Sequence, residues 1–287
     1  MDEAGLVQLE LAETQRRAAE WVPPGIDTTK PSSSRTYDYL LGGAHNFQAD
    51  REAAEQAEKI MPGIRDVARL NRTFLGRVVR TLMDLGIRQF LDIGSGIPTV
   101  GNVHQIAGEI DPRCRVVYVD RDPIAVAHSK MLLRTSEHAT IAHADFTDPE
   151  GIFAAPEMHR LDFGEPIGLL MVAMLHWIPD ASDPHTLLAE YRRRVPAGSY
   201  LAISHLVSDQ DSDRINSAVG TFNLARGHDQ ATTRTYREVE KMFGDFELID
   251  PGLVGCALWR PGGPGDISDD PSTNTQLYGG VARKVAG

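Results

Sequence analysis

Short apolar runs alternate with stretches of helical composition through the middle of this chain. Five apolar runs cover residues 89–94, 114–120, 139–145, 167–175 and 198–205, and helical stretches include residues 62–85, 123–135 and 183–194. Strands that alternate with helices predict a parallel sheet, and strands with few polar residues predict that both of its faces are buried. We therefore expect an α/β fold in which helices cover both faces of a mostly parallel sheet.

The end of the chain breaks this alternation. After a helical pattern over residues 235–243, the expected strands 246–250 and 276–284 are joined by a loop rich in Gly, Pro and Asp. Two successive strands with no helix between them pair most simply as antiparallel neighbours. The sheet is thus expected to be seven-stranded and to end in a C-terminal antiparallel hairpin at its edge.

The first 60 residues lie outside the sheet pattern. They contain an expected short helix before Pro23, a polar linker over residues 28–34 and a helix that begins near Phe47. Proline and glycine separate these pieces from one another. We expect residues 1–60 to form a helical cap or lid segment and residues 61–287 to form the main domain.

Composition limits the kinds of partner. The chain of 287 residues carries 40 Asp and Glu against 29 Lys and Arg, which gives a formal net charge of −11. Sequence-independent binding to nucleic acid depends on Lys and Arg, so a nucleic-acid partner is not favoured. No apolar stretch is long enough to cross a bilayer, and two cysteines cannot build a disulfide framework. We therefore expect a cytoplasmic protein with no membrane partner, and no metal site, because no group of side chains has ligand spacing.

A glycine turn directly follows the first apolar run, in Asp92-Ile93-Gly94-Ser95-Gly96. Open α/β sheets bind ligands beyond the carboxyl ends of their strands, and glycines let a ligand approach the backbone there. A purely structural turn is the alternative. The ligand is favoured by Asp120, which ends the second strand 24 residues after Gly96. An acid at that position binds the hydroxyl groups of a ribose.

The rest of the turn distinguishes between two adenosine-containing cofactors. A dinucleotide fingerprint requires a third glycine, but Thr99 occupies that position and follows Pro98. The carboxylate of Asp92 would also repel the phosphates of NAD(P). It would attract the ammonium group of S-adenosyl-L-methionine, which has a ribose and no phosphate. S-adenosyl-L-methionine is therefore the favoured cofactor.

Further motifs follow the later strands. They are Ala144-Asp145-Phe146 after the third strand and LLMVAMLHWIPD at the fourth. With the glycine turn and the ribose acid, this ordered set resembles the class I S-adenosylmethionine-dependent methyltransferases. More narrowly, RTYDYLLGGAHNF, QFLDIGSGIPT, VDRDP and LHWIPD are similar to an actinobacterial S-adenosyl methyltransferase family that was once classed as a domain of unknown function.

The resemblance extends from about Ser34 to the C-terminus. It implies a Rossmann-like fold and transfer of a methyl group to an O, N or C nucleophile of a small molecule. It also implies that Asp92 holds the ammonium group of the cofactor, that Asp120 binds the ribose and that Arg121 flanks the adenine. The turn that would line the methionine part consists of Gly94, Ser95 and Gly96.

The same resemblance places the adenine beside Asp145 and Phe146, with the carboxylate accepting from its exocyclic amine. A helix N-cap before Pro149 is the alternative role for Asp145. The residues expected near the sulfonium, at the end of the fourth strand, are Ala173, Met174 and Leu175.

Two histidines are candidates for the methyl-transfer centre. His176 follows the fourth strand and His205 ends the fifth, so both are expected on the same rim of the sheet. An imidazole could deprotonate or orient an acceptor, because its ordinary pKa is near neutrality. The alternative is that these side chains only shape the pocket, since transfer from a sulfonium requires alignment more than a strong base.

The N-terminal block supports a separate hypothesis about a lid. Its aromatic and apolar residues surround the double glycine Gly42-Gly43, which could act as a hinge or could simply join two packed helices. As a lid it would fold over the cofactor and bring Arg35 or Arg72 near the methionine carboxylate. The other residues of this expected lid contact are Tyr37, Tyr39 and Asn46.

Two other functions share parts of this pattern. A non-catalytic module that binds S-adenosylmethionine would contain the same turn and acids. An NAD(P)-dependent oxidoreductase or epimerase would share the sheet and the ribose acid, but the sequence contains neither the third glycine nor a Tyr-x-x-x-Lys pair. Methyl transfer is therefore the favoured function.

Overall fold

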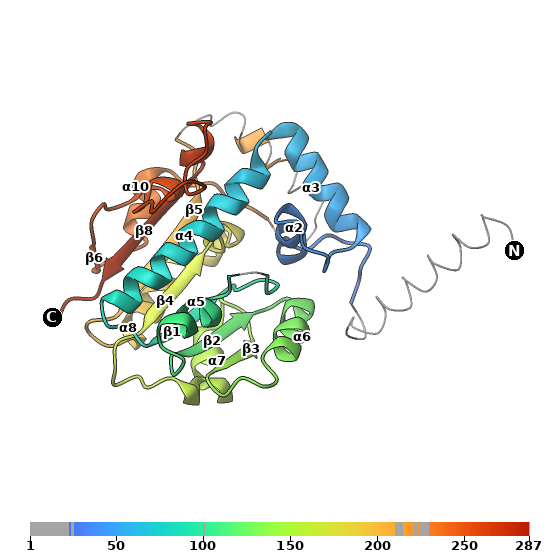
Figure 1. Cartoon of the computed structure of the whole chain (residues 1–287). Helices are drawn as coiled ribbons and strands as arrows, with labels where there is room; N and C mark the ends of the chain where they lie inside the picture. The colour runs from blue at the N-terminus through green and yellow to red at the C-terminus, as the bar shows by residue number, and fades with distance from the viewer. Residues whose placement is uncertain are drawn as a thin grey trace, which may run out of the picture.

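The computed structural model describes residues 23, 26–99, 101–209, 215–217, 219–220, 223 and 230–286. The short helix expected before Pro23 lies outside these residues. The elements below are numbered as in Figure 1.

A parallel sheet forms the centre of the molecule (Figure 1). Its five parallel strands are β1 Gln89–Ile93, β2 Arg115–Asp120, β3 Ala139–His143, β4 Gly168–Val172 and β5 Tyr200–Leu206. The order across the sheet is β3-β2-β1-β4-β5-β8-β6. The five strands coincide with the five apolar runs, which confirms the α/β prediction.

The C-terminal strands complete the sheet in antiparallel orientation. They are β6 Glu247–Leu248, β7 Val254–Gly255 and β8 Leu277–Arg283. Strand β8 lies between β5 and β6 and pairs with both in antiparallel register, so β6 forms the edge. The expected hairpin is present, but β7 adds a short strand beside β8, and the sheet has eight strands rather than seven. With only two residues, β7 is too short to give an apolar pattern.

Helices cover both faces of the sheet, as the sequence predicts. Side chains of β1 alternate between the faces: Phe90 belongs to one core cluster, Leu91 and Ile93 to the other. The first face is covered by α4 Ile64–Asp84, α5 Val103–Ile110 and α6 Pro123–Leu132, and the second by α7 Pro149–Ala154, α8 Pro184–Arg194 and α10 Tyr236–Lys241. Short 3₁₀ helices are η1 Pro156–Arg160, η2 Leu175–Trp177, η3 Asp180–Ser182, η4 Cys256–Leu258 and η5 Thr273–Thr275.

Two helices from the N-terminal segment, α2 Ser33–Leu40 and α3 Gln48–Ile60, pack beside the N-terminal half of α4 (Figure 1). A fully buried carboxylate connects them: Asp50 of α3 pairs with Arg35 of α2 at 3.0 Å and also accepts from the backbone N–H groups of Ser32 and Phe47. Because a buried charge is costly without partners, these bonds fix α2 against α3.

In the described part of the chain, no helix is long and apolar enough to cross a membrane.

The close packing of β1 against β4 gives a test of the sheet. Gly168 of β4 is paired with Phe90 of β1, and an added Cβ would lie 2.5 Å from the Phe90 ring. We expect G168A to lower the free energy of unfolding by about 1–3 kcal/mol in urea denaturation, because the core must shift. The matched control is G108A: Gly108 is inside α5 with no atom within 4 Å of its Cβ position. Alanine there should stabilise the protein by up to about 1 kcal/mol. Equal stability of G168A and the wild type would contradict this packing.

Candidate cofactor and acceptor site

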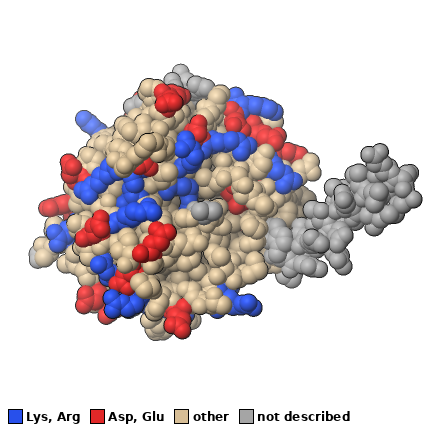
Figure 2. Space-filling model, viewed as in Figure 1, with Lys and Arg blue, Asp and Glu red and all other residues tan. Residues whose placement is uncertain are grey.

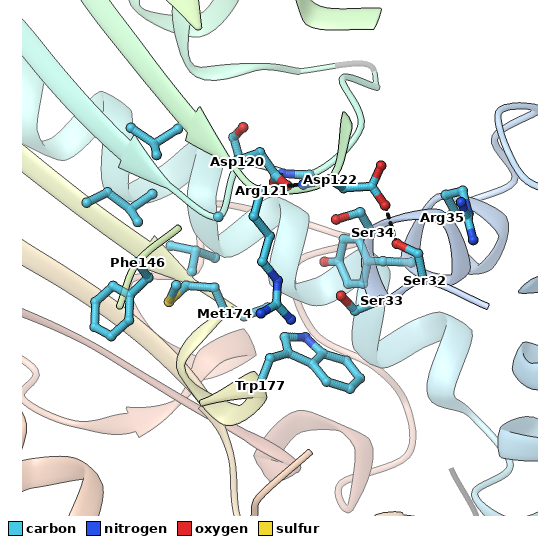
Figure 3. A pocket seen from close by; sticks show the side chains of 18 of the residues that line it. Ser32, Ser33, Ser34, Arg35, Asp120, Arg121, Asp122, Phe146, Met174 and Trp177 are labelled. Atoms are coloured by element: carbon cyan, nitrogen blue, oxygen red, sulfur yellow. Dashed lines mark hydrogen bonds between the residues drawn. The ribbon is translucent and has the colours of Figure 1, made fainter. Parts of the chain in front are cut away.

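A cavity of about 510 Å³ opens at the carboxyl ends of the parallel strands. It lies where the strand order reverses between β1 and β4, the point at which open α/β sheets bind ligands. Residues of the loops after β1, β2, β3 and β4 line one side, and the start of α2 lines the other (Figure 3). The cavity therefore joins the sheet to the N-terminal helices.

The glycine turn forms the cavity floor after β1. Gly94 and Gly96 have φ values of 72° and 69°, in the left-handed region that favours glycine. The N–H groups of Gly94 and Ser95 both donate to the carbonyl of Val119 on β2, at 2.8 and 3.2 Å. A Cβ on Gly94 would lie 2.6 Å from the Cβ of Met174, so the loops after β1 and β4 touch here. Glycine is required for conformation and for space.

Asp120 ties the loops after β1 and β2 together. Its carboxylate accepts from the backbone N–H of Gly96 at 2.6 Å and from that of Asp122 at 2.8 Å. Burial raises the pKa of Asp120 to about 6, although both hydrogen bonds oppose that shift. Each carboxylate oxygen has a second acceptor position, so Asp120 can still accept two hydroxyl groups.

Asp92 is a buried carboxyl at the end of β1, with 6% of its surface exposed. Within the described residues it makes no hydrogen bond. Burial raises its pKa to about 7, the charge of Arg72 lowers it and the charge of Asp120 raises it further. A carboxyl in this condition gains most from a cationic ligand, which would both pair with it and lower its pKa.

The loop after β3 presents Asp145 and Phe146. Asp145 accepts from the N–H and hydroxyl of Thr147, both at 2.8 Å, and lies 3.4 Å from Arg121. The helix-cap alternative for Asp145 is excluded, because Asp148 caps α7 by accepting from Gly151 N–H. The ring of Phe146 stacks on Tyr191 in the core, 4.9 Å between centroids, and points away from the cavity in Figure 3. Only the backbone of Phe146 is available to a ligand.

A chain of hydrogen bonds holds the end of β4. Ala173 has a φ of 54°, which is strained for a residue with a Cβ. Its N–H donates to Ser204 Oγ at 2.9 Å, and that hydroxyl donates to Asn71 Oδ1 at 2.6 Å. Asn71 Nδ2 donates to the hydroxyl of Tyr37 at 2.8 Å, which in turn donates to the Ala68 carbonyl at 3.1 Å. The relay links the strained residue to α4 and α2.

His176 lies beside this strained residue and lines the cavity. It is 7% exposed, and Nδ1 is buried without a hydrogen-bond partner among the described residues. Burial, reinforced by the charge of Arg234, lowers its pKa to about 3. His176 is therefore neutral near pH 7. It can accept or donate one hydrogen bond but is a weak base.

His205 does not lie on the cavity rim as expected from the sequence. It is fully buried in β5, and both ring nitrogens are occupied: Arg234 donates to Nε2 at 2.8 Å, and Nδ1 donates to the carbonyl of Leu206 at 2.7 Å. Burial lowers its pKa well below the ordinary value. Arg234 also donates to the carbonyls of Leu175 and Ile178, so this pair supports the loop that carries His176. His205 is a structural residue here.

The other expected site residues divide into two groups. Those that line the cavity are Arg35, Tyr37, Arg72, Asp92, Gly94, Ser95, Gly96, Asp120, Arg121, Asp145, Phe146, Ala173, Met174 and His176. Three do not, which corrects the expectation for them. Tyr39 points to Glu55 and lies under the Arg65 guanidinium. Asn46 donates to Asp38 and to the Gly43 carbonyl, and Leu175 is fully buried in the core.

Several lining residues were not expected from the sequence. Ser32, Ser33 and Ser34, read as linker, form the start of α2, and the Ser32 hydroxyl donates to Asp122 (Figure 3). Asp122 also caps α6, which the Asp-Pro pair before a helical stretch could have indicated. Asn71 could have been recognised in the sequence, because it is a polar residue on the apolar stripe of a helix.

Comparison with known proteins identifies the family. A family model described as S-adenosyl methyltransferase matches residues 19–285. The chain belongs to the S-adenosyl methyltransferase family. It is an enzyme that uses S-adenosyl-L-methionine, which decides against the NAD(P) and non-catalytic alternatives considered from the sequence.

Two solved structures are similar over nearly their whole length. One is a protein provisionally described as a methyltransferase from Thermobifida fusca YX, with 40% identity, 93% of this chain and 99% of that chain covered, and a TM-score of 0.85. The other is a DUF574 family protein from Streptomyces avermitilis MA-4680, with 36% identity, 90% and 99% coverage, and a TM-score of 0.85. No curated protein matches the chain.

The cavity of this S-adenosyl methyltransferase suits its cofactor chemically. Asp92 offers a buried carboxyl without a hydrogen-bond partner in the described residues, and Ser95 offers a buried hydroxyl that likewise has none. Asp120 retains two acceptor positions on the neighbouring strand. An ammonium group and a pair of ribose hydroxyls would satisfy these groups.

The raised pKa of Asp92 predicts a pH dependence of stability. Because its pKa is 3.8 in an ordinary environment and about 7 when folded, the folded state holds this proton more tightly, and stability falls as pH rises from 4 to 7. In urea titrations without cofactor, we expect the free energy of unfolding of D92N to exceed that of the wild type by about 1–3 kcal/mol at pH 8. The two values should differ little at pH 4. The control D66N changes a half-exposed carboxylate of α4 and should show no such difference. A D92N effect that is the same at both pH values would refute the assignment.

Proposed function

We propose that this enzyme transfers the methyl group of S-adenosyl-L-methionine to an O, N or C nucleophile of a small molecule, within the cavity at the β1–β4 reversal. The observation that carries the proposal is the buried Asp92 carboxyl beside the glycine turn, one strand from Asp120. A ligand with a cationic amino-acid end and a ribose fits that pair of acids.

Each loop would bind one part of the cofactor. Asp92 would pair with its ammonium group, and Ser95 with the turn glycines would line the methionine chain. Asp120 would accept the ribose hydroxyls without releasing Gly96, because its free acceptor positions suffice. The backbone of Phe146 and the carboxylate of Asp145 would receive the adenine, with Arg121 beside it.

Arg72 is the better candidate for the methionine carboxylate. The guanidinium of Arg35 is already paired with Asp50 and also donates to the Lys30 carbonyl, so binding would cost it an existing partner. Arg72 lies close enough to Asp92 to lower the pKa of that carboxyl, and it donates to the carbonyl of Gly101 at 3.1 Å. Its position on α4 supports a role opposite the ammonium site.

When bound, the cofactor supplies a methyl group on a positively charged sulfur: the nucleophile would form a bond to the methyl carbon as the carbon–sulfur bond breaks, and the sulfur would leave with that electron pair as a neutral thioether. The protein contributes mainly alignment. Ala173 and Met174 would form the wall beside the transferring methyl group, where the hydrogen-bond relay keeps the backbone in place. His176 would orient an acceptor hydroxyl or amine by accepting its hydrogen bond, because the imidazole is neutral.

A small-molecule acceptor in the cytoplasm completes the proposal. Lys and Arg are interspersed with Asp and Glu on the face in Figure 2, and the net charge is −11. Such a surface does not favour long anionic polymers. Both cysteines are free thiols, which is in keeping with a reducing compartment.

Calorimetry with S-adenosylhomocysteine tests the cofactor assignment. We expect the wild type to bind it and D120N to bind about 10–100-fold more weakly, because hydrogen bonds to a charged acceptor are lost. NADH should give no heat of binding at the same concentration. As a control, D84N removes an exposed carboxylate at the end of α4 and should bind as the wild type does. Failure of wild-type protein to bind either S-adenosylmethionine or its demethylated product would overturn the proposal.

A further inference from the structure

A second, smaller cavity of about 110 Å³ adjoins the cofactor cavity. Its walls come from α2, α3 and the start of α4 on one side, and from the ends of β4 and β5 with residues 215, 219 and 231 on the other. The two cavities share the lining residues Ser33, Tyr37, Ala173, His176 and Trp177. A molecule in the smaller cavity would therefore meet the cofactor beside Ala173 and His176.

The smaller cavity differs sharply from the larger one in its chemistry. None of the described residues that line it carries a charge, whereas Asp, Arg and Lys side chains surround the cofactor cavity. Most of its wall is aliphatic, including Leu40, Met61 and Val67. A charged group placed here would lose its water without gaining a partner, which costs several kcal/mol even after relaxation.

Two of its polar lining groups can be followed through their hydrogen bonds. The hydroxyl of Tyr37 already accepts from Asn71 and donates to the Ala68 carbonyl, so Tyr37 contributes its ring to the wall. His176 instead has a buried Nδ1 with no partner in the described residues and lies where the two cavities meet. The imidazole of His176 thus places a polar group at the junction, next to the methyl-transfer wall.

From this arrangement we infer that the smaller cavity is the acceptor site. The acceptor is an uncharged molecule with an apolar aromatic or aliphatic body. This body enters the cavity and presents the nucleophile beside His176. The inference rests on the proposed function, because it needs the cofactor in the larger cavity. It narrows the small-molecule class to acceptors without a carboxylate, phosphate or ammonium group on the inserted part.

Three para-substituted phenols that differ in charge test the inference. p-Cresol is neutral, 4-hydroxybenzoate is an anion and tyramine is a cation, and all three carry the same ring and hydroxyl. With the full-length protein saturated by S-adenosylhomocysteine, ligand-observed NMR titration should show p-cresol bound at least about ten-fold more tightly than either charged phenol, because only it avoids an unpaired buried charge. Equal or tighter binding of a charged phenol, or no binding of p-cresol, would overturn the inference.

Variants in the cavity wall locate the binding. Ile64 is a half-buried wall residue at the start of α4, and Ala57 is a wall residue on α3. I64W and A57L should each weaken p-cresol binding by about ten-fold or more by filling the cavity, while S-adenosylhomocysteine affinity stays within about two-fold. The matched control is L85W, which makes the same kind of change at an exposed residue just after the other end of α4.

The two affinities separate the possible failures. Loss of S-adenosylhomocysteine binding in the wild type contradicts the proposed function itself. Normal S-adenosylhomocysteine binding with p-cresol binding that survives both I64W and A57L contradicts only the acceptor site. Because the two variants lie on different helices, a folding defect in one leaves the other as the test.

Discussion

The reversal of strand order between β1 and β4 is the constraint on which the site depends. Successive strands β1, β2 and β3 run to one side, while β4 and β5 run to the other, so the loops that leave β1 and β4 separate and open a crevice. The glycine turn and the loop after β4 face each other across that point. Asp92 ends β1, and the Asp120 carboxylate on the next strand fixes the turn through Gly96. Ala173 directly follows β4 and lies in the opposite wall.

The electrostatics of this crevice favour a cationic ligand. Burial raises the pKa values of both Asp92 and Asp120, which means that their charged forms are unfavourable in the folded protein. Arg72 offsets part of this cost at Asp92 but is itself held by a backbone carbonyl. An ammonium group brings the missing positive charge. The same groups that destabilise the folded chain near neutral pH would therefore give it affinity for a cationic cofactor under the proposed function.

The sequence predicted the parts of this structure that depend on local pattern. Strands buried on both faces give continuous apolar runs in the sequence. The place of Asp92 and Asp120 in the cavity could be predicted because both lie at strand ends. It could not predict features that depend on distant partners. His205 follows the pattern expected of a residue on the cavity rim. Its structural role depends on a hydrogen bond from Arg234, which lies much later in the sequence. Likewise Arg35 could not be separated from a ligand-binding arginine until Asp50 was seen beside it.

Tyr37 of α2 lies between the two cavities. Its ring lines both, and its hydroxyl belongs to the relay that runs through Asn71 and Ser204 to the strained N–H of Ala173. Any shift of α2 would therefore change the walls of both cavities and one end of this relay together. Helix α2 thus forms part of the wall of both cavities.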